Sequence, residues 1–383
     1  MIYLDNAATS GKKPESVYSA VNDALMNHCG NPGRGGHRIA RSAGAIVENA
    51  RMKCAELFGA ADVDEISFTC NCTEALNLAI HGLLKPGDHV ITSSMEHNSV
   101  ARPLEYLRKR GVEITVLPAA IDSGVDPEDV RKALRKNTAL AAVTHISNVT
   151  GTVNDIRTIG AVCKENGIRF MVDAAQSAGN TPIDVQGMNI DILAFPGHKS
   201  LLGPQGTGGL YINKSIRIEP LKQGGTGSVS ESLEQPETVP DRYESGTLNV
   251  PGIAGLAAGV EFILKTGIEI IHKKESGLTE KLIRGLSEIP GITVYAPAAG
   301  KSRGAVVSAT IDGIEPQELA LLLDSEFDIA VRAGLHCAAY THRALETDVC
   351  GGTVRFSPGY FTTEEDVSKC IEAMALISRE VQL

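Results

Sequence analysis

The chain has 383 residues, of which 43% are hydrophobic and 21% are charged, and its formal net charge at pH 7 is −10. This composition is typical of a globular protein with a large core, and the negative net charge disfavours binding to a nucleic-acid backbone. No apolar run approaches the roughly 20 residues that span a bilayer, and the first residues lack the pattern of a signal peptide, so we expect no membrane partner and a cytoplasmic location.

The first two thirds of the chain are expected to alternate strands with helices. Strands are predicted at 65–69, 88–93, 112–117, 139–145, 168–173, 190–195 and 207–212, with helices at 14–27, 38–58, 126–135 and 155–166 and others opening at 70–77 and after 95–99. The strands are apolar and rich in β-branched residues. The pattern therefore predicts an α/β fold with a mostly parallel sheet of about seven strands and helices on both faces.

The last third is expected to form a second, smaller α+β domain. A long loop over 223–252 and a helical stretch over 253–287 lead into it. Further strands are predicted at 292–295, 304–311, 329–332 and 353–357, with helices at 315–325 and 363–380. We therefore expect a large domain over 15–255 and a small domain over 256–383. Residues 1–14 are expected to be part of the small domain.

Eight cysteines are scattered along the chain. In a cytosolic protein they should be reduced. Cys70 and Cys72 are separated by a single residue, and no second pair matches them. The sequence therefore predicts no metal site.

A lysine and an aspartate each follow an apolar strand. Lys199 lies near the end of the stretch 191–200, and Asp173 ends the strand before it. Burial depresses the pKa of a lysine, and a neutral amine can form a Schiff base with an aldehyde. The alternatives are a surface lysine and an aspartate that caps a helix. Together the two residues predict pyridoxal 5′-phosphate (PLP), with Asp173 paired to the protonated ring nitrogen.

Other polar residues follow the same set of strands. In such sheets, ligands bind at the carboxyl ends of the strands, where Thr73, His97 and Asn148 are placed. Thr73 and the backbone amides of a helix start could bind a phosphate, or form a plain N-cap. His97 could stack on a flat ring, or be structural. His198 could contact the phosphate or move protons.

A second informative stretch is 331–338. Cys337, beside His336 and near arginines, could be a nucleophilic thiolate, although most free cysteines are buried core residues. Arg355, in a strand-like segment, could hold a carboxylate with both arms of its guanidinium, or form an ordinary surface ion pair.

In their order along the chain, from 5–9 to Arg355, these motifs resemble the cysteine desulfurases of the class V aminotransferase family, PLP fold type I. The segment 332–338 is similar to the group II branch, which includes selenocysteine lyase-like enzymes. Leu335 stands where that branch usually has a histidine, Pro196 stands where a phosphate-binding serine is usual, and Cys72 lies in Asn-Cys-Thr where Gly-Thr-Thr is typical. Leu335 is expected to remove a proton carrier and to make the pocket more apolar.

The resemblance implies a role for each candidate residue. At the cofactor it implies Lys199 as the Schiff-base lysine, Asp173 at the ring nitrogen, His97 on the ring, Gln176 and Asn148 near the ring hydroxyl, Cys72, Thr73 and His198 at the phosphate, and Thr247 at the phosphate of the second subunit of a homodimer. On the substrate side it implies Cys337 as sulfur acceptor beside His336, with Arg355, Asn148 and Asn6 binding the amino acid.

The implied reaction converts L-cysteine to L-alanine and leaves the sulfur on Cys337 as a persulfide, from which an acceptor protein could take it. One alternative is a selenocysteine lyase that acts on L-selenocysteine. Another is a different class V aminotransferase or lyase, which would share Lys199 and Asp173 but would not need Cys337. The last is a non-enzymatic scaffold, which would bind no cofactor.

Overall fold

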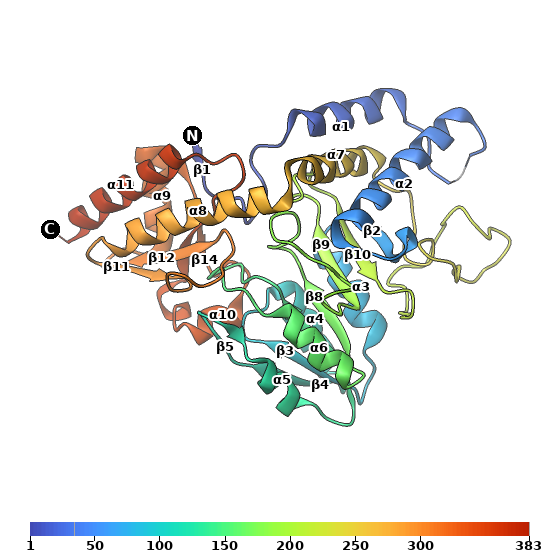
Figure 1. Cartoon of the computed structure of the whole chain (residues 1–383), viewed down its shortest axis with the longest axis horizontal. Helices are drawn as coiled ribbons and strands as arrows, with labels where there is room; N and C mark the ends of the chain where they lie inside the picture. The colour runs from blue at the N-terminus through green and yellow to red at the C-terminus, as the bar shows by residue number, and fades with distance from the viewer. Residues whose placement is uncertain (34, 383) are drawn as a thin grey trace.

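The protein contains a large and a small β-sheet, each covered by helices. The structure is a computed structural model and describes residues 1–33 and 35–382. Figure 1 shows the large sheet between helices in the first two thirds of the chain, and the small sheet at the other end, beside both termini.

The large sheet carries the strand ends at which the candidate residues were expected. Its strand order is β2-β10-β9-β8-β7-β3-β4, and β10 runs antiparallel to both of its neighbours while the other pairs are parallel. The strands are β2 (Ile66–Thr69), β3 (His89–Ser93), β4 (Glu113–Leu117), β7 (Thr138–Thr144), β8 (Arg169–Asp173), β9 (Ile192–Pro196) and β10 (Gly208–Ile212). The prediction of an α/β fold with a mostly parallel sheet is confirmed.

Helices cover both faces of this sheet, which explains why β3, β9 and β10 are buried along their whole length. One apolar cluster joins the sheet to α2, α5, α6 and α7, and another joins it to α3 and α4. The helices are α1 (Glu15–Asn27), α2 (Arg38–Phe58), α3 (Cys72–Leu83), α4 (Asn98–Arg108), α5 (Pro127–Ala133), α6 (Ile156–Glu165) and α7 (Val250–Thr266).

The small sheet is antiparallel, with the order β11-β12-β15-β14. Its strands are β11 (Ile292–Tyr295), β12 (Val307–Ile311), β14 (Arg332–Gly334) and β15 (Thr353–Phe356), and α8 (Ile268–Ser287), α9 (Pro316–Phe327) and α11 (Glu364–Val381) pack on it. The N-terminal strand β1 (Ile2–Tyr3) pairs with β13 (Ile329–Ala330), and Leu4 lies in the core of this part. The first residues therefore pack with the small sheet.

The helical stretch predicted over 253–287 is interrupted at Gly267, whose φ of +87° separates α7 from α8. The predicted domain boundary between residues 255 and 256 falls inside α7, and Val260 and Ile263 of that helix pack in the core of the large sheet. The predicted division itself stays a prediction, and we propose that it lies at Gly267.

Several short elements were not predicted. They are β1, β5 (Ala119–Ala120), β6 (Gly124–Val125), α10 (Ala339–Ala344), and the 3-10 helices at Val63–Glu65 and Asp348–Cys350. Each spans at most two turns or one residue pair, too short for a periodic pattern to reveal.

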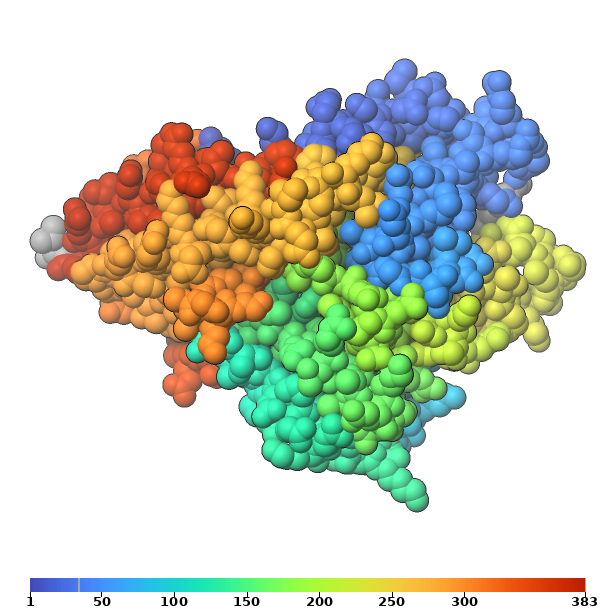
Figure 2. Space-filling view, in the orientation of Figure 1, coloured from blue at the N-terminus to red at the C-terminus, as the bar shows by residue number. Residues whose placement is uncertain are grey.

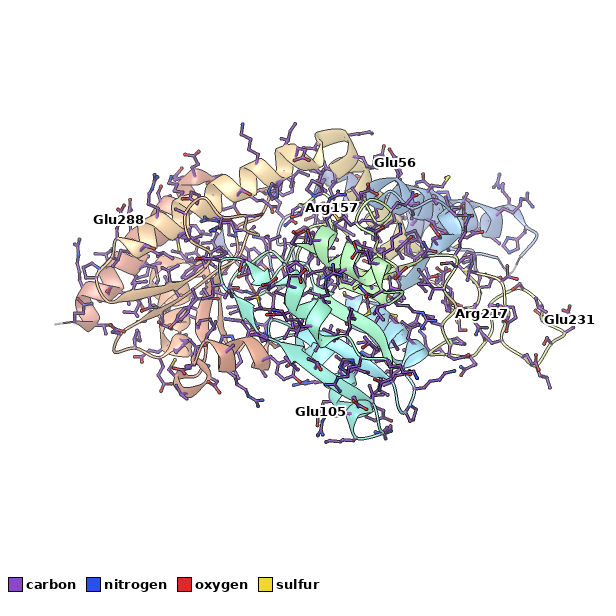
Figure 3. The ribbon with its side chains drawn as sticks, turned by 60° about the horizontal axis from the view of Figure 1, so that its bottom comes forward. Glu56, Glu105, Arg157, Arg217, Glu231 and Glu288 are labelled. Atoms are coloured by element: carbon purple, nitrogen blue, oxygen red, sulfur yellow. The ribbon has the colours of Figure 1, made fainter. Side chains whose placement is uncertain are left out.

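The segment over 213–249, between β10 and α7, projects from the end of the molecule that carries the large sheet (Figures 1 and 2). Glu231 lies near its outer tip in Figure 3, and the side chain of Leu233 is fully exposed. The side chain of Asn31, in the connection between α1 and α2, donates a hydrogen bond of 3.4 Å to Thr247 Oγ1. Two projecting connections therefore lie side by side.

Candidate active site

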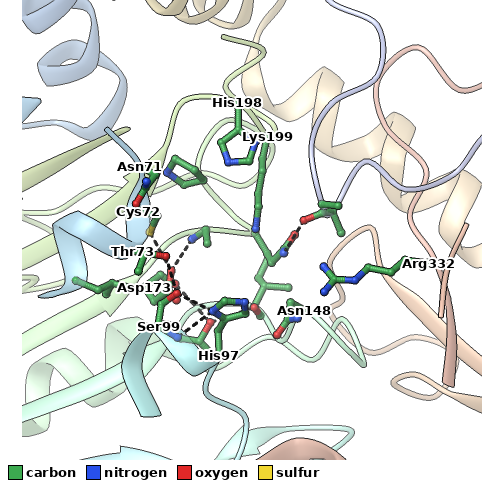
Figure 4. Close-up of a pocket in the computed structure, with 18 of the residues that line it drawn as sticks. Asn71, Cys72, Thr73, His97, Ser99, Asn148, Asp173, His198, Lys199 and Arg332 are labelled. Carbon is green, nitrogen blue, oxygen red and sulfur yellow. Dashed lines mark hydrogen bonds between the residues drawn. The ribbon is translucent and has the colours of Figure 1, made fainter. Parts of the chain in front are cut away.

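A pocket of about 200 Å³ lies at the carboxyl ends of the strands of the large sheet and is closed on one side by residues of the small sheet. In Figure 4, Lys199 extends into it, with Asp173, Thr73 and His97 on one side and Arg332 across from them. Of the residues predicted from the sequence, the pocket is lined by Cys72, Thr73, His97, Asn148, Asp173, Gln176, His198, Lys199 and Arg355.

Lys199 follows β9 after a sharp turn at Gly197. A Cβ at Gly197 would lie 2.1 Å from Thr207 Oγ1, so the turn requires glycine. Lys199 Nζ has no hydrogen-bond partner among the described residues. Burial lowers the pKa of Lys199, the guanidinium groups of Arg355 and Arg332 add to this effect, and Asp173 opposes it. The lysine is thus poised to lose its proton more readily than a surface lysine.

Asp173 is buried at the end of β8. Its Oδ1 accepts hydrogen bonds from the Ala175 amide at 2.8 Å and from Cys72 Sγ at 3.6 Å, while Oδ2 has no partner within the described part of the chain. Burial raises the pKa of Asp173, and the Ala175 amide and Lys199 oppose the shift. A cationic group in the pocket would therefore be a favourable partner for the free carboxylate oxygen.

His97 connects β3 to α4, where its ring caps the helix. Its Nδ1 accepts a hydrogen bond from the Ser99 amide at 3.0 Å, and Ser99 Oγ lies 2.8 Å from the same nitrogen. Ser99 Oγ also lies 2.8 Å from Thr73 Oγ1. Burial lowers the pKa of His97 to about 3, helped by the positive charge of Lys199. The ring is therefore neutral, with its orientation fixed by Ser99.

The N-terminus of α3 also opens into the pocket. Asn71 caps the helix by accepting a hydrogen bond of 2.9 Å from the Glu74 amide, and Ala75 donates to the Asn71 carbonyl at 3.2 Å. The amides of Cys72 and Thr73 precede these bonds, and both residues line the pocket. Free amides at a helix N-terminus favour an anion such as a phosphate.

Two further residues that line the pocket contact the opening segment of the chain. His198 Nδ1 lies 3.1 Å from Thr9 Oγ1, and burial lowers its pKa to about 4. Gln176 donates a hydrogen bond of 3.1 Å to the carbonyl of Ala7. Both contacts fix the opening segment of the chain, 5–10, against the large sheet.

Two arginines lie at the opposite end of the pocket. Arg355, on β15, has a side chain that is only 1% exposed. Its Nη1 donates to the Asn148 carbonyl at 3.1 Å and its Nη2 donates to Asp5 Oδ1 at 2.8 Å, while its Nε has no partner among the described residues. Arg332, on β14, donates from Nη2 to Cys337 Sγ at 3.3 Å.

Cys337 is exposed in the short loop between β14 and α10. Both His336 and Cys337 have positive φ, at +48° and +56°, and the Asn98 amide donates to the Cys337 carbonyl at 2.7 Å. Cys337 lines a groove together with Thr73, His97 and Ser99, which also line the pocket. Cys337 therefore lies in a groove that adjoins the pocket.

Besides Cys337, three predicted residues do not line the pocket. His336 is buried, with Nε2 3.0 Å from Thr353 Oγ1, and burial lowers its pKa to about 2. Asn6 donates from Nδ2 to the Ser357 carbonyl at 2.9 Å. Thr247 is exposed on the projecting segment. The roles expected for these three residues stay predictions.

Three residues that the sequence did not single out belong to the arrangement: Ser99, Arg332 and Asp5. Ser99 lies two residues after His97, a spacing at which a helix-capping side chain commonly pairs with the chain. Arg332 is in the same stretch as Cys337, and was noted only as a nearby charge. Asp5 carries no local signal that it would meet Arg355, 350 residues later.

The described residues contain no group of three or more histidine, cysteine, aspartate or glutamate side chains that could hold a metal ion. The arrangement is instead one of a reactive amine, a buried carboxylate, an anion-binding helix end and an exposed thiol. These groups suit an organic cofactor with a phosphate and a basic ring.

Known proteins resemble this chain over nearly its whole length. A sequence model of the aminotransferase class-V family matches residues 2–370. A probable cysteine desulfurase from Methanothermobacter thermautotrophicus is 37% identical over 98% of this chain and 94% of its own length, and one from Pyrococcus abyssi is 37% identical over 96% and 92%.

Solved structures agree. The apo structure of a cysteine desulfurase from Thermococcus onnurineus superposes with a TM-score of 0.93 at 34% identity, covering 99% of this chain and 95% of that one. The Escherichia coli cysteine desulfurase CsdA superposes with a TM-score of 0.88 at 29% identity, over 100% and 94%. The expected fold type I architecture is confirmed, and the chain belongs to the class V aminotransferase family.

Proposed function

We propose that this chain is a PLP-dependent cysteine desulfurase, which converts L-cysteine to L-alanine and takes the sulfur onto Cys337 as a persulfide. The observation that carries the proposal is the position of the exposed Cys337 beside the pocket that Lys199 and Asp173 line. Cys337 lines an adjoining groove, and its sulfur accepts a hydrogen bond of 3.3 Å from Arg332, which lines the pocket. An aminotransferase or another lyase would need the lysine and the aspartate but not the thiol.

The residues of the pocket fit PLP. Asp173 offers an unpaired carboxylate oxygen to a protonated ring nitrogen, and the amides of Cys72 and Thr73 offer donors to a phosphate. His97 is neutral and fixed, as a ring that stacks on another ring should be. When bound, the cofactor withdraws electrons from the α-carbon of the amino acid, so that bonds near that carbon can break.

Each of the chain's own groups has a task in this reaction. Arg355 binds the α-carboxylate of the substrate with the donors that Asp5 and Asn148 leave free. Lys199 Nζ, whose pKa is lowered by burial, takes the α-proton and returns a proton later. Asp173 stays ionised opposite the protonated ring nitrogen, because its unpaired carboxylate oxygen then accepts a hydrogen bond from that cation.

Cys337 performs the step that distinguishes a desulfurase. Its thiolate attacks the sulfur of the substrate, a sulfur–sulfur bond forms, and the carbon–sulfur bond breaks. The electron pair of the broken bond stays with the substrate carbon, which takes up a proton and becomes the methyl group of alanine. Arg332 Nη2 donates a hydrogen bond of 3.3 Å to this sulfur and holds it in place.

A selenocysteine lyase remains the second candidate from the sequence. Leu335 was expected to make the pocket more apolar, but its side chain is 41% exposed and does not line the pocket. The structure thus offers no reason to prefer L-selenocysteine, and the relatives at 33–37% identity carry the name cysteine desulfurase.

The partners follow as further parts of the proposal. Thr247, exposed on the projecting segment, is proposed to reach the phosphate of a second subunit in a homodimer. An acceptor protein would take the sulfur from the exposed Cys337. In the described part of the chain, no helix has both the length and the apolar character needed to cross a membrane. The cytoplasmic location and the absence of a nucleic-acid partner stay predictions.

The test measures alanine released from L-cysteine by the PLP-loaded protein, with a reducing thiol as sulfur acceptor. We expect the wild type to release alanine and sulfide in equal amounts without any keto acid. Cys337→Ala should keep the colour of the bound cofactor and lose this activity, whereas Cys350→Ala, which removes another exposed thiol, should retain it. Full activity of Cys337→Ala on L-cysteine would refute the proposal.

A further inference from the structure

The Arg355 guanidinium, at the substrate end of the pocket, forms an ion pair with a carboxylate. It is paired with Asp5, whose Oδ1 accepts a hydrogen bond of 2.8 Å from Nη2. Asp5 follows β1 and does not line the pocket itself. Arg355 thus faces the pocket with a carboxylate behind it, and burial lowers its pKa while Asp5 opposes that shift.

The Asp5 side chain is not needed to attach the N-terminal segment. The Ser357 amide donates to the Leu4 carbonyl at 2.6 Å, and the Asn6 amide donates to the Ser357 carbonyl at 3.2 Å. The Ala7 amide donates to Ser357 Oγ at 2.9 Å. Backbone pairing therefore holds the segment against the end of β15 on both sides of Asp5. The ion pair between Asp5 and Arg355 is not required for this attachment, so we look for a different role for it.

The explanation lies in the number of charges. Two guanidinium groups, those of Arg332 and Arg355, line this end of the pocket, and the Asp5 carboxylate cancels one of them. A substrate with one carboxylate then meets one uncompensated positive charge. A substrate with a second carboxylate on its side chain finds no charge left for it, and must be desolvated without compensation.

We propose that Asp5 is a specificity-determining residue, which sets the pocket to accept amino acids with a single carboxylate and to reject those with an anionic side chain. It acts through Arg355, by fixing one edge of the guanidinium and cancelling its charge. The inference rests on the proposed function, because it assumes that the α-carboxylate of an amino acid binds at Arg355.

The test compares Asp5→Asn with the wild type in binding two ligands to the PLP-loaded protein. L-Alanine is the single-carboxylate product, and L-aspartate has a carboxylate where cysteine has its thiol. Dissociation constants come from the change in the cofactor's absorption band. We expect Asp5→Asn to improve binding of L-aspartate relative to L-alanine by about tenfold, the size expected for one charged hydrogen-bonded pair.

Two further variants separate specificity from structure. Glu15→Gln removes a carboxylate from an exposed position nearby on α1 and should leave the ratio of the two dissociation constants unchanged. In Asp5→Asn combined with Arg332→Gln, the gain for L-aspartate should disappear, because the released charge is removed again. Dissociation of PLP and the thermal unfolding midpoint are measured on every variant, to detect a general loss of structure.

An unchanged ratio in Asp5→Asn, or equal weakening of both ligands, would overturn the inference and leave Asp5 as a structural residue. This outcome is distinct from a failure of the proposed function. That failure would appear as the absence of alanine release from L-cysteine by the wild type, while the binding ratios would still be measurable because they need no sulfur chemistry.

Discussion

Glu96 is a buried carboxyl group that should make the free energy of unfolding depend strongly on pH. Its side chain is fully buried behind the pocket, next to His97. Its Oε1 accepts hydrogen bonds from Ser93 Oγ at 2.5 Å and from the Thr144 amide at 2.9 Å, while Oε2 has no partner among the described residues. Burial raises the pKa of Glu96 to about 8, against an ordinary value of 4.5, and the nearby charge of Asp173 adds to the increase.

The sign of the effect on stability follows from this shift. In the unfolded chain Glu96 ionises near pH 4.5, but in the folded protein it keeps its proton until about pH 8. Its contribution to the free energy of unfolding is therefore fully present below pH 4.5 and is lost as the pH rises to 8. At about 1.4 kcal/mol per pKa unit, the total loss is about 5 kcal/mol, a large part of the stability of an ordinary domain.

The perturbation is Glu96→Gln, which keeps the acceptor oxygen and removes the titrating proton. Urea unfolding of the apoprotein at pH 5, 6, 7 and 8 should show the variant gaining stability relative to the wild type by about 1.4 kcal/mol per pH unit. Glu275, whose pKa burial raises to about 7, titrates in both proteins and cancels in the difference. Glu231→Gln, at the exposed tip of the projecting segment, is the control and should run parallel to the wild type. Parallel curves for Glu96→Gln as well would refute the reasoning.

Three further predictions concern the site. Borohydride reduction of the PLP-loaded protein, followed by peptide mapping, should place the label on Lys199 and leave none on Lys199→Ala; a label on another lysine would remove Lys199 from its role. Arg355→Ala should weaken amino-acid binding by about 1.5–3 kcal/mol, roughly 10- to 150-fold, and change PLP binding far less; loss of PLP with unchanged amino-acid affinity would assign Arg355 to the phosphate instead. Arg332→Ala should slow the release of alanine from L-cysteine, because Cys337 Sγ loses the hydrogen bond that holds it in place; an unchanged rate would exclude this role.

Much of the large sheet could be predicted from the sequence, because its strands carry a dense local signal. β8 ends on Asp173, and β9 is an apolar run that is followed within three residues by Lys199, so the sequence itself marks where both residues leave the sheet. Parallel strands bring their carboxyl ends to the same edge, which is enough to place both residues in one pocket. Neither argument requires knowledge of how the strands are ordered.

The small-sheet part of the site was less accessible to such reasoning. The loop that contains Cys337 depends on positive φ angles at His336 and Cys337. Neither residue is a glycine, so the sequence gives no sign of this turn. Its position is fixed by the Asn98 amide, which belongs to α4 in a distant part of the sequence. His336, which is predicted to act beside Cys337, is buried with its Nε2 3.0 Å from Thr353 Oγ1, a contact that no local pattern indicates.

The pairing of Asp5 with Arg355 shows why charges at this end of the pocket resist prediction. An arginine in a strand can be recognised as a possible carboxylate clamp from its own chemistry, but its net effect depends on which carboxylates lie behind it. That information comes from the N-terminal segment, which reaches β15 only because β1 pairs with β13 and Ser357 binds Leu4 and Asn6. A residue that can bind a substrate carboxylate is therefore recognisable from its own sequence neighbourhood. The net charge that selects among substrates depends instead on which distant segments pack against that residue.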